Sequence, residues 1–413
     1  MTAVKLADNV YWVGANVHTE DLFEGIWPTP NGVTLNAYVV RGDKTAVIEL
    51  VREWGGASLT FLQNLKSLGI TPHDIDYIVL NHLEPDHTGF MYTLRNLAPR
   101  AEILCTQRGA ALVDGFYGIK DNVRAVKTGD TLDLGQGKEL AFTEIPHVHW
   151  PETMVSFERS SGILFAGDAF GSFGAFRGSI FDDEQPAVNK SYWEAEMLRY
   201  YASIVATFSP HVLKAVDALK NISVKMIAPS HGLIWRGRPQ AVINKYLRYA
   251  NYNKEFAEPE VCVVWGSMYG NTEVMLSAVL RGIAGEGMPV KVHRVPNEDA
   301  SFILADAYRA AGLIIGVPTY EYAMFPPGRY ILELFVKKHV WYKKVGFFGS
   351  YGWSGGAQKD FDELSKNMHW DILDPLTFRG YPTPELLEKG EQMGAALARQ
   401  VKEISPKTRD EEY

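Results

Sequence analysis

Residues 77–87 contain the stretch Tyr-Ile-Val-Leu-Asn-His-Leu-Glu-Pro-Asp-His, an apolar run that ends in a cluster of ionisable side chains. The run at 77–80 has the length and the branched side chains of a buried strand. Four ionisable groups follow, and they would repel or desolvate one another unless a cation held them. For any one of them a solvated loop is the simpler interpretation, but the set of four predicts a metal site. The four are His82, Glu84, Asp86 and His87.

Further ligands are expected at the ends of other strands, since one loop cannot complete a coordination sphere. Asp168 and His231 each follow an apolar, strand-like run. His149 precedes Trp-Pro-Glu, and His147 lies two residues before it, so both would face the same side of an extended segment. The pattern alone leaves these two as alternatives. The other histidines stand singly and are expected at the surface or in the core: His18, His73, His211, His293, His339 and His369.

The elements around this cluster predict a sandwich fold over residues 1–250. Hairpin strands come first, joined by the turn Arg-Gly-Asp-Lys, and α/β units follow. This order is typical of an αββα sandwich. The expected strands are 10–13, 36–40, 45–49, 77–80, 102–105, 162–166 and 225–228, and the expected helices are 59–68 and 192–219.

A polar, proline-containing stretch at 251–260 is interpreted as a linker, and strict alternation of strands and helices follows over 261–405. Such alternation predicts a doubly wound parallel sheet with helices on both faces. The acidic end, 406–413, is interpreted as a solvated tail. The expected strands are 261–266, 290–295, 312–317 and 344–349, and the expected helices are 273–284, 299–309, 328–338, 356–367 and 384–403.

Three loops at strand ends of this second region are typical of a phosphate-bearing ligand with a planar ring. The first precedes a helix, whose N-terminal N–H groups attract phosphate. It lacks the Walker lysine and the Gly-x-Gly-x-x-Gly pattern, so a triphosphate or a dinucleotide is disfavoured. The other loops combine aromatic and small residues, although their aromatics have an alternative interpretation as ordinary loop residues. The candidate contacts are Ser267, Met268, Tyr269, Gly270, Asn271, Thr272, Pro318, Thr319, Tyr320, Glu321, Tyr322, Ser350, Tyr351, Gly352, Trp353, Ser354, Gly355 and Gly356.

Composition narrows the class of protein. The length of 413 residues favours two domains, and the net charge of −8 argues against a general nucleic-acid binder. No signal peptide or membrane-spanning run is expected. Cys105 and Cys262 lie in apolar runs and are expected to be buried free thiols. Two such cysteines exclude a disulfide framework. Together with the expected absence of a signal peptide, this predicts a cytoplasmic protein. No Cys-x-x-Cys pair is present, so no iron–sulfur module is expected.

With its motifs in this order, the chain resembles the flavodiiron proteins, in which a metallo-β-lactamase-like domain is fused to a flavodoxin-like domain. The resemblance covers the chain to about residue 405 and rests on the His-x-Glu-x-Asp-His motif with the later His, Asp and His. The context His-Trp-Pro-Glu-Thr-Met at 149–154 matches the family, which favours His149 over His147. The resemblance implies one iron held by His82, Glu84 and His149, a second held by Asp86, His87 and His231, and Asp168 as the bridge.

Glu84 separates this sequence from the hydrolytic relatives of the fold, which carry His-x-His-x-Asp-His and bind zinc. A third carboxylate makes the site harder and more anionic, which suits iron. Zinc has no redox chemistry. The alternative is a zinc hydrolase with a flavodoxin accessory domain. A third interpretation is an electron carrier whose first domain only docks partners.

The resemblance also implies a function and partners. The cofactors would be FMN and two non-haem iron ions with an oxo or hydroxo bridge. The reaction would be reduction of O2 to water, of NO to N2O, or both, and the sequence does not rank them. No catalytic residue beyond the metal ligands is implied. Electrons would come from a rubredoxin-type protein or a reduced deazaflavin, within a head-to-tail homodimer.

Two smaller features have open interpretations. Tyr200 and Tyr201 could donate hydrogen bonds near the metals, although packing in a helix is the simpler role. The pairs 337–338 and 343–344 are lysines that could form a docking patch near the flavin for an acidic carrier, or simply a solvated helix end.

Overall fold

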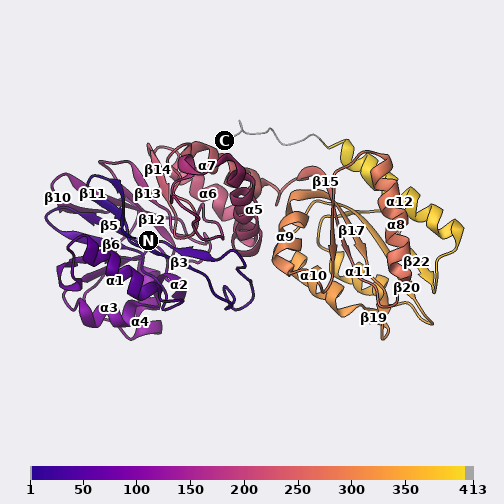
Figure 1. Cartoon of the computed structure of the whole chain (residues 1–413), viewed down its shortest axis with the longest axis horizontal. Coiled ribbons are helices and arrows are strands. Elements are labelled where there is room, and N and C mark those ends of the chain that lie inside the picture. Colours follow the sequence, from indigo (N-terminus) through magenta and orange to yellow (C-terminus); the bar gives the residue numbers. More distant parts are fainter. Residues whose placement is uncertain (1, 405–413) are drawn as a thin grey trace. The chain divides into compact units, whose positions relative to one another are not determined.

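The computed structural model describes residues 2–404, so the predicted tail 406–413 lies outside the described residues. The chain forms two compact units (Figure 1). The first comprises residues up to 201 together with 210–247, and the second comprises 202–209 and the described chain from 248 onward. Among the described residues, no helix combines the length and the hydropathy needed to cross a membrane.

The first unit contains two sheets with helices on their outer faces, as the αββα prediction requires (Figure 1). One sheet has the order β1 (Val4–Ala7), β2 (Val10–Trp12), β5 (Tyr38–Arg41), β6 (Thr45–Ile48), β7 (Tyr77–Val79), β8 (Glu102–Cys105) and β9 (Val123–Ala125). The other has the order β10 (Thr131–Gly135), β11 (Lys138–Glu144), β12 (Met154–Glu158), β13 (Ile163–Phe165) and β14 (Met226–Ala228). A small ribbon is formed by β3 (Ala15–Val17) and β4 (Val33–Leu35). The helices are α1 (Ala57–Ser67), α2 (Pro85–Thr88), α3 (Met91–Leu97), α4 (Gln107–Tyr117), α5 (Lys190–Tyr200), α6 (Ser209–Leu219) and α7 (Pro239–Asn251).

The parallel strands of these sheets direct the predicted ligands to one region. β7 runs parallel to β6 and β8, and β13 runs parallel to β14. All three residues of β13 and of β14 are buried, because both strands are wholly apolar. Each strand therefore ends in a loop that carries a predicted ligand: β7 before His82, β13 before Asp168 and β14 before His231.

The expected single helix over 192–219 was wrong. α5 ends at Tyr200, a π turn follows at Tyr201–Val205, a 3-10 turn at Ala206–Phe208, and α6 starts at Ser209. Pro210 explains the break, because a proline has no N–H and its ring clashes with the carbonyl four residues earlier. Proline is accepted in the first turn of a new helix, which is where Pro210 lies.

The second unit is the predicted parallel sheet with helices on both faces (Figure 1). Its strand order is β16 (Val290–Arg294), β15 (Glu258–Trp265), β17 (Ala310–Gly316), β20 (Lys344–Tyr351) and β21 (Asp371–Ile372), with β22 (Leu376–Arg379) also paired to β20. The helices are α8 (Asn271–Gly285), α9 (Ala300–Arg309), α10 (Pro326–Lys337), α11 (Ala357–Ser365) and α12 (Pro384–Lys402). A separate hairpin consists of β18 (Thr319–Tyr320) and β19 (Ala323–Met324). Because α7 ends at Asn251 and β15 begins at Glu258, the segment joining them is 252–257.

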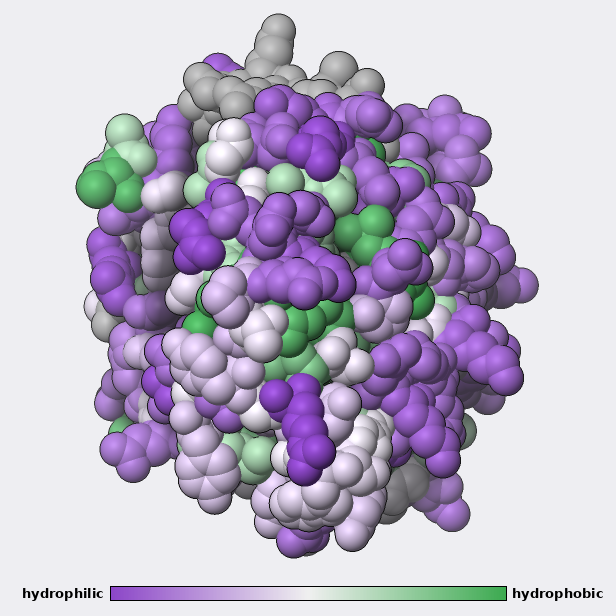
Figure 2. Space-filling model, turned by 90° about the vertical axis from the view of Figure 1, so that its right-hand side faces the viewer, coloured by the Kyte–Doolittle hydropathy of each residue, from purple (hydrophilic) through white to green (hydrophobic). Residues whose placement is uncertain are grey.

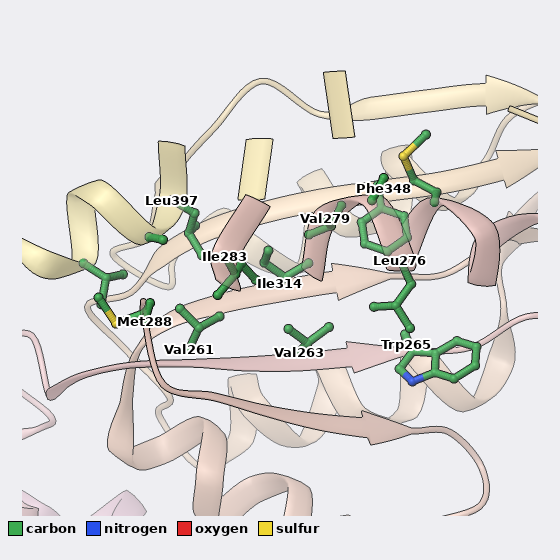
Figure 3. Packing of buried hydrophobic residues seen from close by; sticks show 14 of the residues in the cluster. Val261, Val263, Trp265, Leu276, Val279, Ile283, Met288, Ile314, Phe348 and Leu397 are labelled. Carbon is green, nitrogen blue, oxygen red and sulfur yellow. The ribbon is translucent and has the colours of Figure 1, made fainter. Parts of the chain in front are cut away.

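A buried cluster of apolar side chains holds α8 and α12 against this sheet. Val261, Ile314 and Phe348 come from the strands, Val279 from α8 and Leu397 from α12 (Figure 3). The face of this unit in Figure 2 is mainly hydrophilic, and its hydrophobic residues form small separate areas. Because the cluster joins side chains of the sheet, α8 and α12, removal of these apolar residues from water stabilises the packing of the two helices on the sheet.

The helices α8 and α12 approach each other closely at two glycines. A Cβ at Gly282 would collide with the backbone oxygen of Glu391, and one at Gly394 would collide with that of Val279. By contrast, a Cβ at Gly285, at the end of α8, would meet nothing within 4 Å. The close approach of the two backbones thus depends on Gly282 and Gly394 and does not involve Gly285.

We expect Gly282→Ala to destabilise the second unit by about 1–3 kcal/mol, although alanine favours helix formation by itself, because the added methyl group forces the helices apart. The matched control Gly285→Ala should be neutral or stabilising. Thermal unfolding followed by circular dichroism measures both. Equal stability of the two variants would contradict the close packing of α8 against α12.

Candidate metal centre and cofactor loops

The seven predicted ligands lie together in the first unit, in two groups. The first group is His82, Glu84, His149 and Asp168, and the second is Asp86, His87 and His231. His147, the alternative to His149, lies outside both groups, with its ring against that of His211 (centroids 4.7 Å apart). Of the other histidines, His293 is buried in the second unit between Glu298 and Asp306.

Asp168 joins the two groups. Its Oδ2 lies 3.0 Å from Nε2 of His149 and 3.4 Å from Nε2 of His82. Its Oδ1 lies 3.0 Å from Nε2 of His87 and 3.5 Å from Nε2 of His231. One carboxylate thus presents a separate oxygen to each group, which is the arrangement of a bridging ligand.

Glu84 and Asp86 complete the groups. Oε2 of Glu84 lies 3.0 Å from Nε2 of His149, and Oδ2 of Asp86 lies 3.1 Å from Nε2 of His231. Atoms that share a metal at bonds of about 2.1 Å, with angles of about 90–110° between them, lie roughly 3.0–3.4 Å apart. The separations in both groups fit that spacing.

A short local structure places Glu84, Asp86 and His87. Pro85 begins α2, the position in a helix where the missing N–H of proline costs nothing. The hydroxyl of Thr88 donates to the carbonyl oxygens of Leu83 and Glu84, at 3.2 and 2.9 Å. These contacts fold the loop back on itself and aim its acidic and imidazole groups at one centre.

Burial and charge at the cluster favour cations. Burial by itself lowers the pKa of His82, His87 and His149, but the neighbouring carboxylates outweigh it and raise each pKa to about 10. Burial would raise the pKa of Asp168, yet His87, His149 and His82 hold it well below its usual value. Asp168 is therefore anionic, and either protons on the imidazoles or metal ions must neutralise it.

Unpaired atoms support metal ions over protons. Asp86 Oδ1, His87 Nε2 and Asp168 Oδ1 are buried, and none of them makes a hydrogen bond within the described chain, although the last two lie 3.0 Å apart. Buried polar atoms without partners are rare and call for an explanation such as a bound ion. Imidazole nitrogens together with carboxylate oxygens form a donor set that suits iron, so the residues fit a pair of iron ions.

Partners of the outer imidazole nitrogens fix the ring orientations. Nδ1 of His82 lies 2.8 Å from Oε1 of Glu152, and Nδ1 of His231 donates to the carbonyl oxygen of Thr34 at 2.6 Å. Glu49 lies beside the corresponding nitrogen of His87. Such contacts leave Nε2 as the metal-binding atom. Sequence reasoning missed all three partners, and only Glu152 has a local signal, since it lies in the His-Trp-Pro-Glu stretch.

The loop with His231 is clamped by alternate residues of one extended segment. Thr34 Oγ1 accepts from the Gly232 N–H at 2.7 Å. Asn36 Nδ2 donates to the carbonyl oxygens of Pro229 and Gly232, at 2.8 and 3.0 Å, and the Tyr38 hydroxyl donates to that of Pro229 at 2.6 Å. Residues two apart in extended chain share a face, so the three side chains act as one clamp.

An opening of about 580 Å³ leads to the cluster. Glu84 and Asp86 line it together with Phe23, Arg52 and Trp54. The Phe23 ring stands edge-on to His231, with centroids 5.3 Å apart. A small molecule therefore has a route to the two groups, and that route combines aromatic with charged side chains.

The two tyrosines of the α5 region differ in their surroundings. Tyr200 is buried with its ring 5.8 Å from that of His231, and burial together with Asp168 raises its pKa well above the usual value. It therefore remains protonated near the cluster. Tyr201 packs edge-on against Tyr246, with centroids 5.1 Å apart.

In the second unit, the three predicted loops meet at the carboxyl edge of the sheet. They follow β15, β17 and β20, which are parallel neighbours. The hydroxyls of Thr272 and Ser350 lie 2.8 Å apart and join the first loop to the third. A Cβ at Gly356 would collide with the Tyr322 carbonyl, so the third loop also packs on the second. This edge is where ligands bind in open α/β sheets.

The loops fit FMN in two respects. α8 begins after Gly270, which is left-handed at φ 90°, and none of the described side chains caps that end, so its N–H groups can donate hydrogen bonds to a phosphate. Tyr269, Tyr322 and Trp353 are 91%, 68% and 73% exposed at this edge. Exposed aromatics gathered at one place indicate a binding surface, here one for a planar ring.

The structure contradicts the interpretation of Lys343 and Lys344 as part of a docking patch near the flavin. Lys343 is fully buried, and its Nζ donates to the carbonyl oxygens of Tyr308 and Ala310 at 2.8 and 2.6 Å. Lys344 begins β20 and pairs with Asp371, whereas the cofactor loop follows the other end of that strand, roughly 23 Å away. The lysine pairs in the sequence indicate a charged patch but not the burial of Lys343, which tertiary packing decides.

Comparison with known proteins agrees with this arrangement. A family model described as "ODP family beta lactamase" matches residues 33–232, and one described as "Flavodoxin" matches residues 263–393. The anaerobic nitric oxide reductase flavorubredoxin of Vibrio vulnificus is 34% identical over 402 residues, which are 96% of this chain and 79% of that protein. That of Salmonella arizonae is 32% identical, over 96% and 82% of the two chains.

Solved structures match over nearly the whole chain. The rubredoxin oxygen:oxidoreductase of Desulfovibrio gigas has a TM-score of 0.89 and 31% identity, covering 97% of this chain and 99% of its own. The flavodiiron protein of Giardia intestinalis has a TM-score of 0.91 and 26% identity, covering 97% of each chain.

The fold and site define a two-domain protein in which a metallo-β-lactamase-like domain with a carboxylate–histidine dinuclear site precedes a flavodoxin-like domain. The chain belongs to the flavodiiron protein family. It is an oxidoreductase whose cofactors are FMN and a pair of iron ions.

Iron content tests which of the two histidines that the sequence left as alternatives, His147 or His149, binds metal. We expect His149→Ala to lose most of the bound iron, because it removes a nitrogen that lies 3.0 Å from both Glu84 and Asp168. The matched control His147→Ala should keep the iron of the unmodified protein. Iron analysis after anaerobic reconstitution measures both, and iron loss in the His147 variant alone would contradict the arrangement.

Proposed function

We propose that this chain reduces O2 to water, NO to N2O, or both, with electrons that pass through FMN. The observation that carries the proposal is the buried set of four imidazoles and three carboxylates, in which Glu84 replaces the histidine of the zinc hydrolases. FMN bound at the carboxyl edge of the second sheet would supply electrons, which a hydrolase does not need. The names of the relatives, nitric oxide reductase and oxygen:oxidoreductase, support both substrates.

The side chains around the cluster have definable tasks. Asp168 holds both metal positions with one carboxylate, and Glu84 and Asp86 balance the positive charge of each. When bound, the irons supply a place to bind and reduce a small oxide, and the flavin supplies electrons. Tyr200 keeps its proton and can stabilise negative charge that develops on the substrate. The opening beside Phe23 and Trp54 gives a small substrate access to Glu84 and Asp86.

Partners and assembly are further parts of the proposal. We infer a rubredoxin-type protein or a reduced deazaflavin as the electron donor, and the name of the Desulfovibrio gigas relative supports the first. We also propose a head-to-tail homodimer in which the flavin of one subunit serves the metals of the other. The two buried free thiols, Cys105 and Cys262, support a cytoplasmic location.

Substrate consumption by the iron-loaded, FMN-loaded protein tests the reaction. After anaerobic reduction through a rubredoxin or a reduced deazaflavin, we expect consumption of O2, NO or both, at rates that fall at least 100-fold in Asp168→Ala, which loses the carboxylate shared by both metals. Metal analysis accompanies the assay. A protein that holds two zinc ions, hydrolyses esters and consumes neither gas would overturn the proposal in favour of the hydrolase.

Subunit mixing tests the head-to-tail arrangement. His149→Ala removes a metal ligand, and Gly270→Val closes the left-handed turn (φ 90°) before α8 that the phosphate needs. Each variant alone should be inactive. If the flavin of one subunit serves its partner, mixed dimers formed by refolding or co-expression should regain part of the activity, whereas transfer within one chain predicts none.

A further inference from the structure

Glu49 has a backbone conformation that its residue type does not explain. It follows β6 with a φ of 56°, in the left-handed region that glycine adopts without strain and glutamate rarely enters. Its side chain is buried, with 1% of the residue exposed. Strained residues that persist in a buried position often serve a site, so the side chain itself needs an explanation.

The carboxylate of Glu49 is held in place against His87. Its Oε1 accepts from the Asn81 N–H at 2.9 Å. Its Oε2 lies 3.7 Å from Nδ1 of His87 and has no hydrogen-bond partner among residues 2–404. The backbone is fixed as well, because the Leu50 N–H donates to the His87 carbonyl at 3.0 Å. The left-handed turn is therefore what brings this carboxylate to the outer face of the His87 ring.

The first ligand group has a counterpart. Glu152 lies 2.8 Å from the outer nitrogen of His82 and also accepts from the Leu83 N–H at 3.0 Å. Each group thus has one histidine backed by a buried glutamate, from a different segment of the chain. The contacts differ, because Glu152 hydrogen-bonds its histidine and Glu49 stands 0.9 Å farther away (3.7 − 2.8 Å).

We propose that Glu49 is a positioning residue for His87 and adjusts only the metal of the Asp86–His87–His231 group, as Glu152 does for the other group. Glu49 keeps Nδ1 of His87 facing outward and Nε2 facing the metal, and its carboxylate lowers the reduction potential of that iron. The inference rests on the proposed diiron function. It means that the two iron positions are tuned separately, although they share Asp168.

Three variants of the full-length, iron-loaded protein test this assignment. Glu49→Gln keeps the shape and removes the charge, and Glu49→Gly removes the side chain while relieving the left-handed backbone. Glu152→Gln is the matched change on the other group. Anaerobic competition with a chelator, ⁵⁷Fe Mössbauer spectra and redox titration report on each iron without an activity assay.

We expect both Glu49 variants to weaken one iron about 10–100-fold, to change the Mössbauer signal of that iron alone, and to raise its reduction potential. Glu152→Gln should affect the other iron. Unchanged affinity, spectrum and potential in the Glu49 variants, or an equal effect on both irons, would overturn the inference. An unmodified protein that binds no iron would instead overturn the proposed function. Glu49→Gly also separates the explanations, since a purely structural role predicts altered stability with unaltered iron signals.

Discussion

Three carboxylates and four imidazoles occupy a buried part of the first unit, and their charges must be balanced where water cannot do it. Asp168 is the centre of this constraint, because each of its oxygens faces one ligand group. The strands that end at this point are wholly apolar and buried, so the protein can hold the charged loops rigidly. Most other features of the first unit follow from the need to aim these side chains.

The contacts around the cluster show how the fold meets that need. The Thr34–Asn36–Tyr38 clamp fixes the loop with His231, and Glu152 and the Thr34 carbonyl hold two imidazole rings, while Glu49 lies 3.7 Å from a third. These partners come from segments far from the ligands in sequence. The metal centre thus depends on the packing of both sheets, and not only on the loops that carry its ligands.

Much of this could be predicted from the sequence, for physical reasons that also explain the failures. Apolar runs followed by acidic or histidine residues identified β7, β13 and β14 and their loops, because burial and ligand chemistry are both local signals. The helix break before Pro210 and the buried position of Lys343 were missed, since an amphipathic pattern masked the first and tertiary packing decided the second. Glu49 could not be found, because neither its conformation nor its distance from His87 is encoded in neighbouring residues.

The segment 202–209 belongs to the second unit although the chain on both sides of it belongs to the first. Its contacts include Thr207 with the Lys337 carbonyl at 3.0 Å and Ser209 with the Tyr308 hydroxyl at 3.1 Å. Those partners are synthesised 130 and 99 residues later, respectively. During translation this segment therefore cannot make these two contacts until most of the second unit has left the ribosome. The second unit thus includes a segment that is synthesised before the first unit is complete, which makes biosynthesis of the two units interdependent rather than sequential.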